Sequence, residues 1–274
     1  MQKEIDLGLG TTYERFAVYR WLDSVATRYP VHEVLEGPGD GVAGIAGIHS
    51  IPLAQHGAQV TVALSESWQL DPARRAWQAQ GLADRVQLRH VEGSALPFPD
   101  AAFDLVWNFN RLPFLEPDAL VAEMARLSRR YVMMIVPNRS NYGFPARRLY
   151  HRRTKEPWPY GDRAVMSPKA VRRLLAKEGL RVIEWTWVDV PWWPDIIDPR
   201  AWLRRMLPFL SPDERAPAET EGRGYCWRPE ALPYFDAEGY ADLHRRMSRL
   251  SFIERWPGPR WPFAHHFALL AEKR

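Results

Sequence analysis

The chain has 274 residues, of which 46% are hydrophobic and 26% are charged, and its formal net charge is +4. This balance is ordinary for a soluble globular protein and excludes collagen-like, coiled-coil and intrinsically disordered chains. No apolar run approaches the roughly 18 residues that a membrane-spanning helix needs. The single cysteine, Cys226, excludes an internal disulfide and a cage of thiolate metal ligands. The N-terminal stretch lacks the apolar core of a signal peptide, so we expect a cytoplasmic protein.

Helical patterns and short apolar runs alternate along most of the chain. Helices are predicted over residues 12–28, 43–55, 71–81, 118–129 and 167–179, the last with Ser167 as its N-cap. Strands are predicted over residues 32–36, 58–64, 85–91, 103–109, 131–138 and 181–190, with a final strand over residues 264–273. Strands that alternate with helices at this spacing need right-handed crossovers, which predicts an α/β fold with a doubly wound, mostly parallel sheet.

The alternation fails between Pro191 and Pro262. This stretch contains a basic amphipathic pattern over residues 199–210, a polar loop over residues 211–224 and a helical pattern over residues 240–250. Eight of the thirteen tryptophans lie in the last third of the chain. Because the final strand must return to the sheet, we expect one domain over residues 1–274, in which residues 191–262 form a helical, Trp-rich insertion that serves as a substrate lid.

A glycine-rich stretch, "VLEGPGDGVAG" over residues 34–44, follows the first predicted strand. Such glycines bring the backbone close to a nucleotide at the carboxyl end of a parallel sheet. The stretch fits two registers, an acid-x-G-x-G pattern from Glu36 and the G-x-G-x-x-G pattern of dinucleotide-binding folds from Gly39. The second register leaves residues 36–38 unexplained. It also needs an acid at the end of the second strand, where residues 63–65 offer none.

The downstream segment decides for the first register. "VEGSALPFPDAAFDLVWNFNRLPFLEPDALVAEMARLSRRYVMMIVPN", residues 91–138, closely resembles the third-to-fifth-strand segment of class I S-adenosylmethionine-dependent methyltransferases. The similarity is to the small-molecule enzymes of that family, which include the quinone-biosynthesis C- and O-methyltransferases. It runs from about residue 30 to residue 190 and resumes at the final strand. The resemblance implies a Rossmann-like, seven-stranded sheet whose last strand is antiparallel, with S-adenosylmethionine over the carboxyl ends of the first four strands.

The resemblance also implies a set of cofactor-binding residues. The amino-acid part of the cofactor would be surrounded by Glu36, Gly37, Gly39 and Gly41. Glu92, followed by Gly93 and Ser94, would lie near the adenine amine, and Asn108 would touch the methionine part and face the substrate. One position departs from the family, because Ala63 stands where an acid commonly binds both ribose hydroxyls. Ser65 and Glu66 are the nearby side chains that we expect to reach the ribose instead.

Residues for the acceptor are expected after the fifth strand and in the insertion. "NYGFPARRLYHRR", residues 141–153, offers Tyr142, Arg147, Tyr150 and His151, with His151 as the candidate general base. Trp202, flanked by arginines, is expected to cover an apolar acceptor or to lie on an anionic membrane surface. His265 and His266 are adjacent in a strand and are expected to point to opposite faces, so we predict no metal site.

The favoured function is methyl transfer from S-adenosylmethionine to a small or lipid-like acceptor. Two alternatives remain, a methyltransferase-like protein with weak or lost cofactor binding that acts as a partner or scaffold, and an NAD(P)-linked oxidoreductase. Residues 139–173 contain ten lysines and arginines but only two acids, which fits either an anionic partner or a solvated surface. A nucleic-acid substrate is disfavoured because no recognised binding motif accompanies these charges.

Overall fold

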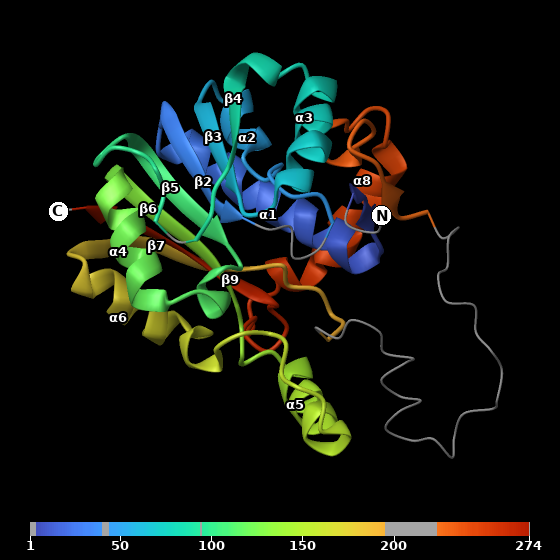
Figure 1. Cartoon of the computed structure of the whole chain (residues 1–274). Coiled ribbons are helices and arrows are strands. Elements are labelled where there is room, and N and C mark those ends of the chain that lie inside the picture. Colours follow the sequence, from blue (N-terminus) through green and yellow to red (C-terminus); the bar gives the residue numbers. More distant parts are fainter. Residues whose placement is uncertain (1–3, 40–43, 94, 195–223, 274) are drawn as a thin grey trace.

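The computed structural model describes residues 4–39, 44–93, 95–194 and 224–273 (Figure 1). Its centre is a seven-stranded sheet in the order β4-β3-β2-β5-β6-β9-β7. The strands are β2 (Glu33–Gly39), β3 (Gln59–Leu64), β4 (Val86–His90), β5 (Phe103–Phe109), β6 (Ser128–Pro137), β7 (Leu180–Val188) and β9 (His266–Lys273). The predicted α/β fold with seven strands is confirmed.

The last strand is antiparallel, as the resemblance implied. β2 pairs in parallel with β3 and β5, and the pairs β3–β4 and β5–β6 are also parallel. β9 is inserted between β6 and β7 and runs antiparallel to both. Its first residue, His266, therefore pairs with Pro137 at the end of β6 and with Val188 at the end of β7. The start of β9 thus lies at the edge of the sheet where the parallel strands end.

Two apolar layers sandwich the sheet because successive strand residues point to opposite faces. Val34, Val62 and Trp107 belong to one buried cluster, whereas Leu35 and Val106 belong to the other. The first face is covered by α1 (Leu9–Arg28), α2 (Ile51–Gln55) and α3 (Leu70–Ala79), and the second by α4 (Pro117–Leu127) and α6 (Pro168–Lys177) (Figure 1). The Ser167 hydroxyl accepts a hydrogen bond from the Ala170 amide, which confirms the predicted N-cap of α6.

The helix predicted over residues 43–55 is wrong in its first half, since α2 begins only at Ile51. Gly44 and Gly47 have φ angles of 73° and 71°, which are not helical. The Ile45 amide donates to Asp6 Oδ1 at 2.8 Å, and the Ile45 carbonyl accepts from Arg15 Nη2 at 2.7 Å. Asp6 and Arg15 thus occupy the amide and the carbonyl that Ile45 would need for hydrogen bonds within a helix.

The described part of the insertion packs on α1. A two-residue strand, β8 (Cys226–Trp227), pairs with β1 (Asp6–Leu7), and α8 (Ala241–Leu250) follows it. Phe16 of α1 meets the rings of Tyr234 and His244 at centroid distances of 5.4 and 4.7 Å. The predicted lid helix over residues 199–210 lies outside the described residues. Within the described residues, no helix is both long enough and apolar enough to cross a membrane.

Candidate active site

The ends of β2, β3 and β4 meet at the carboxyl edge of the sheet. The amide and the hydroxyl of Ser65 both donate to the Gly39 carbonyl, at 2.9 and 3.0 Å. The Val91 amide donates to the Leu64 carbonyl at 2.9 Å. These bonds hold the chain beyond each strand in place. They also place Ser65 next to Gly39 of the glycine-rich stretch.

Gly37 lies so close to β3 that it has no room for a side chain. A Cβ on Gly37 would lie 2.8 Å from both the Cβ and the carbonyl oxygen of Ala63, and the φ angle of Gly37 is +148°. Ala63 itself is fully buried. Its side chain therefore packs beneath β2, and a larger acidic side chain at this position would press on Gly37. This packing accounts for the small residue at position 63.

Glu36 is buried and binds the protein on both of its oxygens. Oε2 accepts from the Ser50 amide at 2.9 Å, and Oε1 lies 3.3 Å from His49 Nδ1. The other nitrogen of His49, Nε2, contacts Nη1 of Arg15. Because a guanidinium only donates, Nε2 accepts, and the ring proton sits on Nδ1 and faces Glu36. Burial and the Arg15 charge lower the pKa of His49, which keeps this ring neutral.

Arg15 connects this histidine to the N-terminal strand. Its Nε and Nη2 atoms donate to the Asp6 carboxylate at 3.0 and 3.1 Å. Tyr234 donates its hydroxyl to the same carboxylate at 2.6 Å. Burial alone would lower the pKa of Arg15, but the interactions with Asp6, Tyr19 and Tyr234 together outweigh burial and raise this pKa above its usual value. Asp6, Arg15, His49 and Glu36 thus form one buried network, which we call the loop-anchoring network, and it fixes residues 44–50.

Two asparagines mark the end of β5. Asn108 is 2% exposed, donates Nδ2 to the Pro38 carbonyl at 2.9 Å, and accepts from the Arg111 amide at 3.1 Å. Asn110 has a φ angle of 60° and places Nδ2 3.0 Å from His266 Nε2. Asn108 therefore ties β5 to the glycine-rich stretch, while Asn110 ties it to the start of β9.

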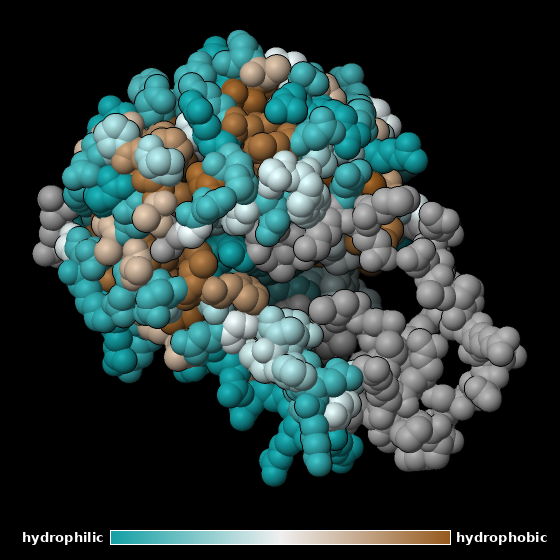
Figure 2. Space-filling model, in the orientation of Figure 1, coloured by the Kyte–Doolittle hydropathy of each residue, from teal (hydrophilic) through white to brown (hydrophobic). Residues whose placement is uncertain are grey.

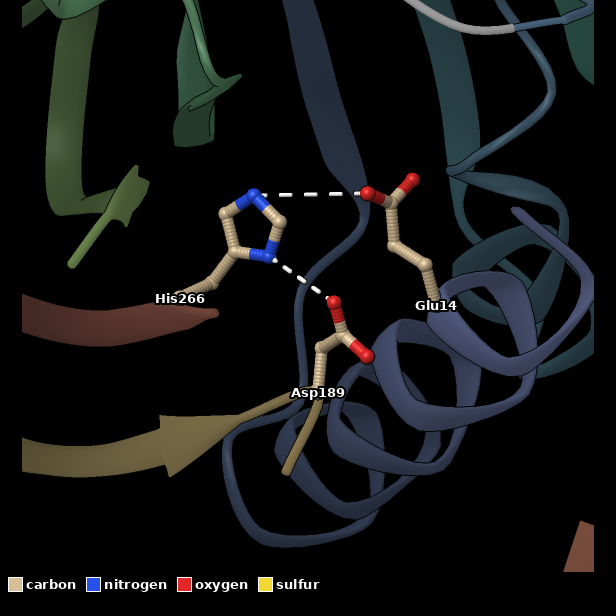
Figure 3. A group of neighbouring side chains, drawn as sticks. All are labelled: Glu14, Asp189 and His266. Atoms are coloured by element: carbon tan, nitrogen blue, oxygen red, sulfur yellow. Dashed lines mark ion pairs between the residues drawn. The ribbon is translucent and has the colours of Figure 1, made fainter. Parts of the chain in front are cut away.

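A histidine and two carboxylates from distant parts of the chain come together beside Asn110 (Figure 3). His266 Nδ1 lies 3.3 Å from Asp189 Oδ2, and His266 Nε2 lies 4.0 Å from Glu14 Oε2. Glu14 comes from α1, and Asp189 directly follows β7. Phe109 places its ring centroid 5.5 Å from that of His266. We call Glu14, Asp189 and His266 the histidine cluster.

The histidine cluster fits an oriented histidine better than a metal centre. One potential ligand atom from each residue lies within 4.8 Å of the others. However, Figure 3 shows the two carboxylates on different ring nitrogens, whereas a cation needs ligand atoms that converge on one point. As placed, Asn110 donates to Nε2, so Nε2 accepts and Nδ1 carries the proton that faces Asp189.

Asp189 also holds the neighbouring histidine. His265 Nδ1 lies 3.0 Å from Asp189 Oδ2, and His265 Nε2 lies 3.1 Å from the Trp193 carbonyl. Burial favours the neutral acid, but the two histidines outweigh burial and lower the pKa of Asp189 to about 2. The expectation that His265 and His266 point to opposite faces is wrong. His265 precedes β9, so strand alternation does not apply to it, and both rings reach one carboxylate oxygen.

Three of the acceptor residues predicted after β6, Arg147, Tyr150 and His151, lie on α5 (Gly143–Thr154) and not in the histidine cluster. α5 projects from the sheet at the bottom of Figure 1. His151 Nδ1 lies 3.2 Å from the Glu156 carbonyl, and Tyr150 donates to the Glu156 carboxylate at 3.1 Å. The Arg147 guanidinium lies 4.3 Å from the centroid of the Tyr160 ring. These three side chains contact the segment that follows α5.

Tyr142, by contrast, contacts the chain beyond β7. It is 42% exposed and donates its hydroxyl to the Trp192 carbonyl at 2.6 Å. Glu66 is exposed beyond β3, and Glu92 and Gly93 are exposed beyond β4. Gly41, Ser94 and Trp202 lie outside the described residues.

The sequence interpretation missed Glu14, Asp189 and the pairing of His266 with them. A usable signal was present in Asp189, an acid placed directly after a strand, at the edge where parallel strands carry functional groups. The adjacent histidines were noted, but only as an improbable metal pair. Glu14 had no signal, because an acid on an amphipathic helix is an ordinary surface residue.

Comparisons with known proteins agree with this fold. Residues 42–130 match a family model described as a methyltransferase domain. A protein of Cereibacter sphaeroides named phosphatidylethanolamine N-methyltransferase is 28% identical over 141 residues, which cover 49% of this chain and 69% of that protein.

Solved structures share the fold. The magnesium protoporphyrin IX methyltransferase of Synechocystis PCC 6803 matches with a TM-score of 0.54 at 16% identity, over 69% of this chain and 85% of that chain. The geranyl diphosphate C-methyltransferase of Streptomyces coelicolor A3(2) matches with a TM-score of 0.50 at 15% identity, over 93% of this chain and 80% of that chain. By sequence match, relative and strand order together, the chain belongs to the class I S-adenosylmethionine-dependent methyltransferases and uses S-adenosylmethionine as its cofactor.

Proposed function

We propose that this enzyme transfers a methyl group to a small, lipid-like acceptor, and that His266 takes the proton that the attacking atom of the acceptor loses. The observation that carries the proposal is the contact between Asp189 and His266 at the carboxyl edge of the sheet. S-adenosylmethionine supplies an activated methyl group when bound, so the protein must chiefly align the acceptor and exclude water. A base is needed only when the attacking atom carries a proton at neutral pH.

The described residues at the strand ends fit the cofactor. We assign Gly39, Ser65 and Glu66 to its amino-acid and ribose parts, Glu92 and Gly93 to its adenine, and Asn108 to its methionine part. A Cβ on Gly93 would meet no atom within 4 Å, so this backbone is open to a ligand. Gly37 and Glu36 act differently in this assignment. Gly37 packs on Ala63, and Glu36 positions residues 44–50 through His49 and Ser50.

The geometry of His266 supports its role as base. Its Nδ1 proton faces a carboxylate that stays ionised, because the pKa of Asp189 is lowered to about 2. Such a partner fixes the tautomer and stabilises the ring after it gains a proton at Nε2. Glu14 Oε2, 4.0 Å from Nε2, adds a second negative charge beside the protonated ring. In this proposal the Asn110 amide turns its oxygen toward Nε2, the proton moves from the attacking atom of the acceptor to Nε2, and the methyl group moves from the cofactor sulfur to that atom.

Aromatic rings and the similar protein together suggest the acceptor class. The partly exposed ring of Phe109 lies beside His266, and the partly exposed ring of Trp193 packs edge-on against the buried Tyr13, the neighbour of Glu14 on α1, with centroids 5.2 Å apart. Rings of this kind bind the apolar part of an amphiphile. The relative named phosphatidylethanolamine N-methyltransferase supports an amine on a phospholipid as the first acceptor to test.

The test is methyl transfer to phosphatidylethanolamine in detergent micelles, with methyl-labelled S-adenosylmethionine and mass spectrometry of the lipid. We expect labelled mono-, di- or trimethylated lipid from the wild-type enzyme. His266→Gln should lower the rate by about 10²- to 10⁴-fold, the usual contribution of a general base. Its affinity for S-adenosylhomocysteine, measured by calorimetry, should stay unchanged.

Each failure has a separate meaning. Cofactor binding without transfer to this lipid, or to any component of a total lipid extract, would contradict the acceptor class. An unchanged rate for His266→Gln would contradict the role of the base. If the wild-type protein binds no S-adenosylhomocysteine at millimolar concentration, the cofactor assignment fails, and the role as a partner or scaffold becomes the better explanation.

A further inference from the structure

A second feature of the molecule, outside the histidine cluster, is a groove lined by arginines. It has a volume of about 470 Å³ and is lined by Arg139, Ser140, Phe144, Pro145, Arg148 and Arg163. We call it the arginine groove. It lies between the turn after β6, the first turns of α5 and the short 3-10 helix over Arg163–Val165. Its lining contains three guanidinium groups and no carboxylate.

The protein places these arginines without neutralising them. The Arg139 amide donates to the Met166 carbonyl at 3.1 Å, and Arg139 Nη1 donates to the Arg163 carbonyl at 3.3 Å. The Arg163 guanidinium lies 5.4 Å from the centroid of the Trp158 ring. Among the described residues, no ion pair engages Arg139, Arg148 or Arg163.

The acids nearest in sequence are engaged elsewhere. Asp162 uses Oδ1 to accept from the Ala164 amide at 2.8 Å, as the N-cap of the short 3-10 helix. Glu156 accepts from Tyr150 on the later turns of α5. Figure 2 shows hydrophilic side chains projecting at the bottom of the view, where α5 lies. The positive charge of the groove therefore faces outward from a basic part of the surface.

The chemistry of the lining selects an anion of a particular kind. Guanidinium groups match the oxygens of phosphate in pairs of parallel hydrogen bonds, and several on one groove repel each other until an anion is bound. Ser140 adds a hydroxyl donor, and Phe144 and Pro145 add apolar surface. Leu149, on the next turn of α5, is 42% exposed. A phosphate attached to an apolar chain satisfies both parts of this surface.

We propose that the arginine groove binds the phosphate group of a phosphate ester, presented by an anionic lipid surface. The groove is connected to the catalytic edge by the backbone, because Asn138, the residue before Arg139, donates its amide to the His265 carbonyl at 2.7 Å. Arg139 therefore follows a residue that is hydrogen-bonded to the neighbour of His266. The proposal does not depend on which acceptor is methylated, since the groove shares no residue with that cluster.

The test compares two triple variants of the full-length protein that lose the same charge. Arg139→Gln, Arg148→Gln and Arg163→Gln together remove the arginine groove. Arg152→Gln, Arg153→Gln and Lys169→Gln together serve as the control, because these exposed residues of the same basic segment lie outside the groove. Co-sedimentation is measured with phosphatidylcholine vesicles, with and without phosphatidylglycerol. Calorimetry with inorganic pyrophosphate measures binding of a soluble phosphate, and circular dichroism checks that both variants are folded.

We expect the wild-type protein to bind the vesicles that contain phosphatidylglycerol. The groove variant should bind them at least about tenfold more weakly than the control variant, because the loss of three positive charges weakens membrane binding equally in both. The wild type could instead bind pyrophosphate but not the vesicles, with only the groove variant losing pyrophosphate. That result would support the phosphate site but overturn the lipid surface as its source. Equal loss in both folded variants, or no binding of either probe by the wild type, would overturn the proposal.

Discussion

Asp189 holds two histidines with one carboxylate oxygen, and this makes its charge important for stability. The pKa of Asp189 is lowered to about 2 by the histidines, against the opposing effect of burial. A carboxyl group whose pKa is lower in the folded state stabilises the fold above its unfolded pKa of about 4, and this stabilisation is lost as the pH falls toward the folded pKa. At pH 5, the free energy of unfolding of the wild-type protein should therefore exceed that of Asp189→Asn by about 2 kcal/mol.

Urea unfolding of both proteins between pH 5 and pH 2 measures this difference directly. The difference should shrink as the pH falls from about 4 to about 2, because the wild-type carboxyl group then gains a proton. Asparagine is the suitable replacement, since Asp189 has a φ angle of 55° and asparagine tolerates this conformation. A difference that stays constant over this range would show that the charge of Asp189 contributes nothing.

Gly37 is a second residue whose role can be measured. Gly37→Ala would place a Cβ 2.8 Å from two atoms of Ala63, which must move apart. Gly57→Ala is the matched control, because Gly57 also has a positive φ angle, +94°, but no atom within 4 Å of its Cβ position. Strain in the backbone costs about 1 to 3 kcal/mol in either variant, and crowding adds about 1 to 3 kcal/mol at Gly37 alone. Equal losses in thermal or urea unfolding would exclude crowding.

At the scale of elements, α1 positions residues 44–50 through Arg15. Arg15→Met should lower the free energy of unfolding by about 3 to 5 kcal/mol, because it leaves the buried Asp6 carboxylate without its cation. Arg20→Met is the control, since its pair with Glu254 is 43% exposed at the arginine and such pairs contribute about 1 kcal/mol or less. Affinity for S-adenosylhomocysteine should fall only in the Arg15 variant, because His49 and Glu36 lose their anchor. Unchanged affinity in a folded Arg15 variant would contradict the coupling.

Local signals decided which elements could be predicted. Ser167 caps α6 by a bond within its own turn, so a local pattern predicted that helix correctly. The segment 43–55 failed because its backbone bonds go to Asp6 and Arg15, which are distant in sequence. A local pattern of small and apolar residues carries no information about such partners. The central strands were predicted well, because their apolar runs match buried strands of a parallel sheet.

At the scale of the whole molecule, the sequence predicted the sheet and its functional edge better than the residues that meet there. The antiparallel last strand came from the family resemblance, and it brings His266 to the ends of β6 and β7. The histidine cluster joins residues 14, 189 and 266, which only the complete fold brings together. A family motif assigned a role to Asn108, which stays a prediction, whereas no motif points to the contacts between α1, β7 and β9.

Cofactor binding should also be visible in the stability of the whole molecule. A ligand that binds only the folded state adds about 2.7 kcal/mol to the free energy of unfolding at about 100 times its dissociation constant. Thermal unfolding with increasing S-adenosylhomocysteine therefore reports its affinity without an acceptor. We expect Glu66→Gln to need at least about tenfold more ligand for the same shift, because a charged acceptor for the ribose hydroxyls is lost.

Glu238→Gln controls for the loss of one exposed negative charge, since Glu238 is an exposed residue of the insertion and does not follow a strand of the sheet. Its curve should coincide with that of the wild type. Ala63 is fully buried beside Gly37, so we expect a side chain beyond β3 to hold the ribose, and Glu66 is an exposed acid there. Coincident curves for Glu66→Gln and the wild type would show instead that the enzyme holds its cofactor without an acid at the end of β3.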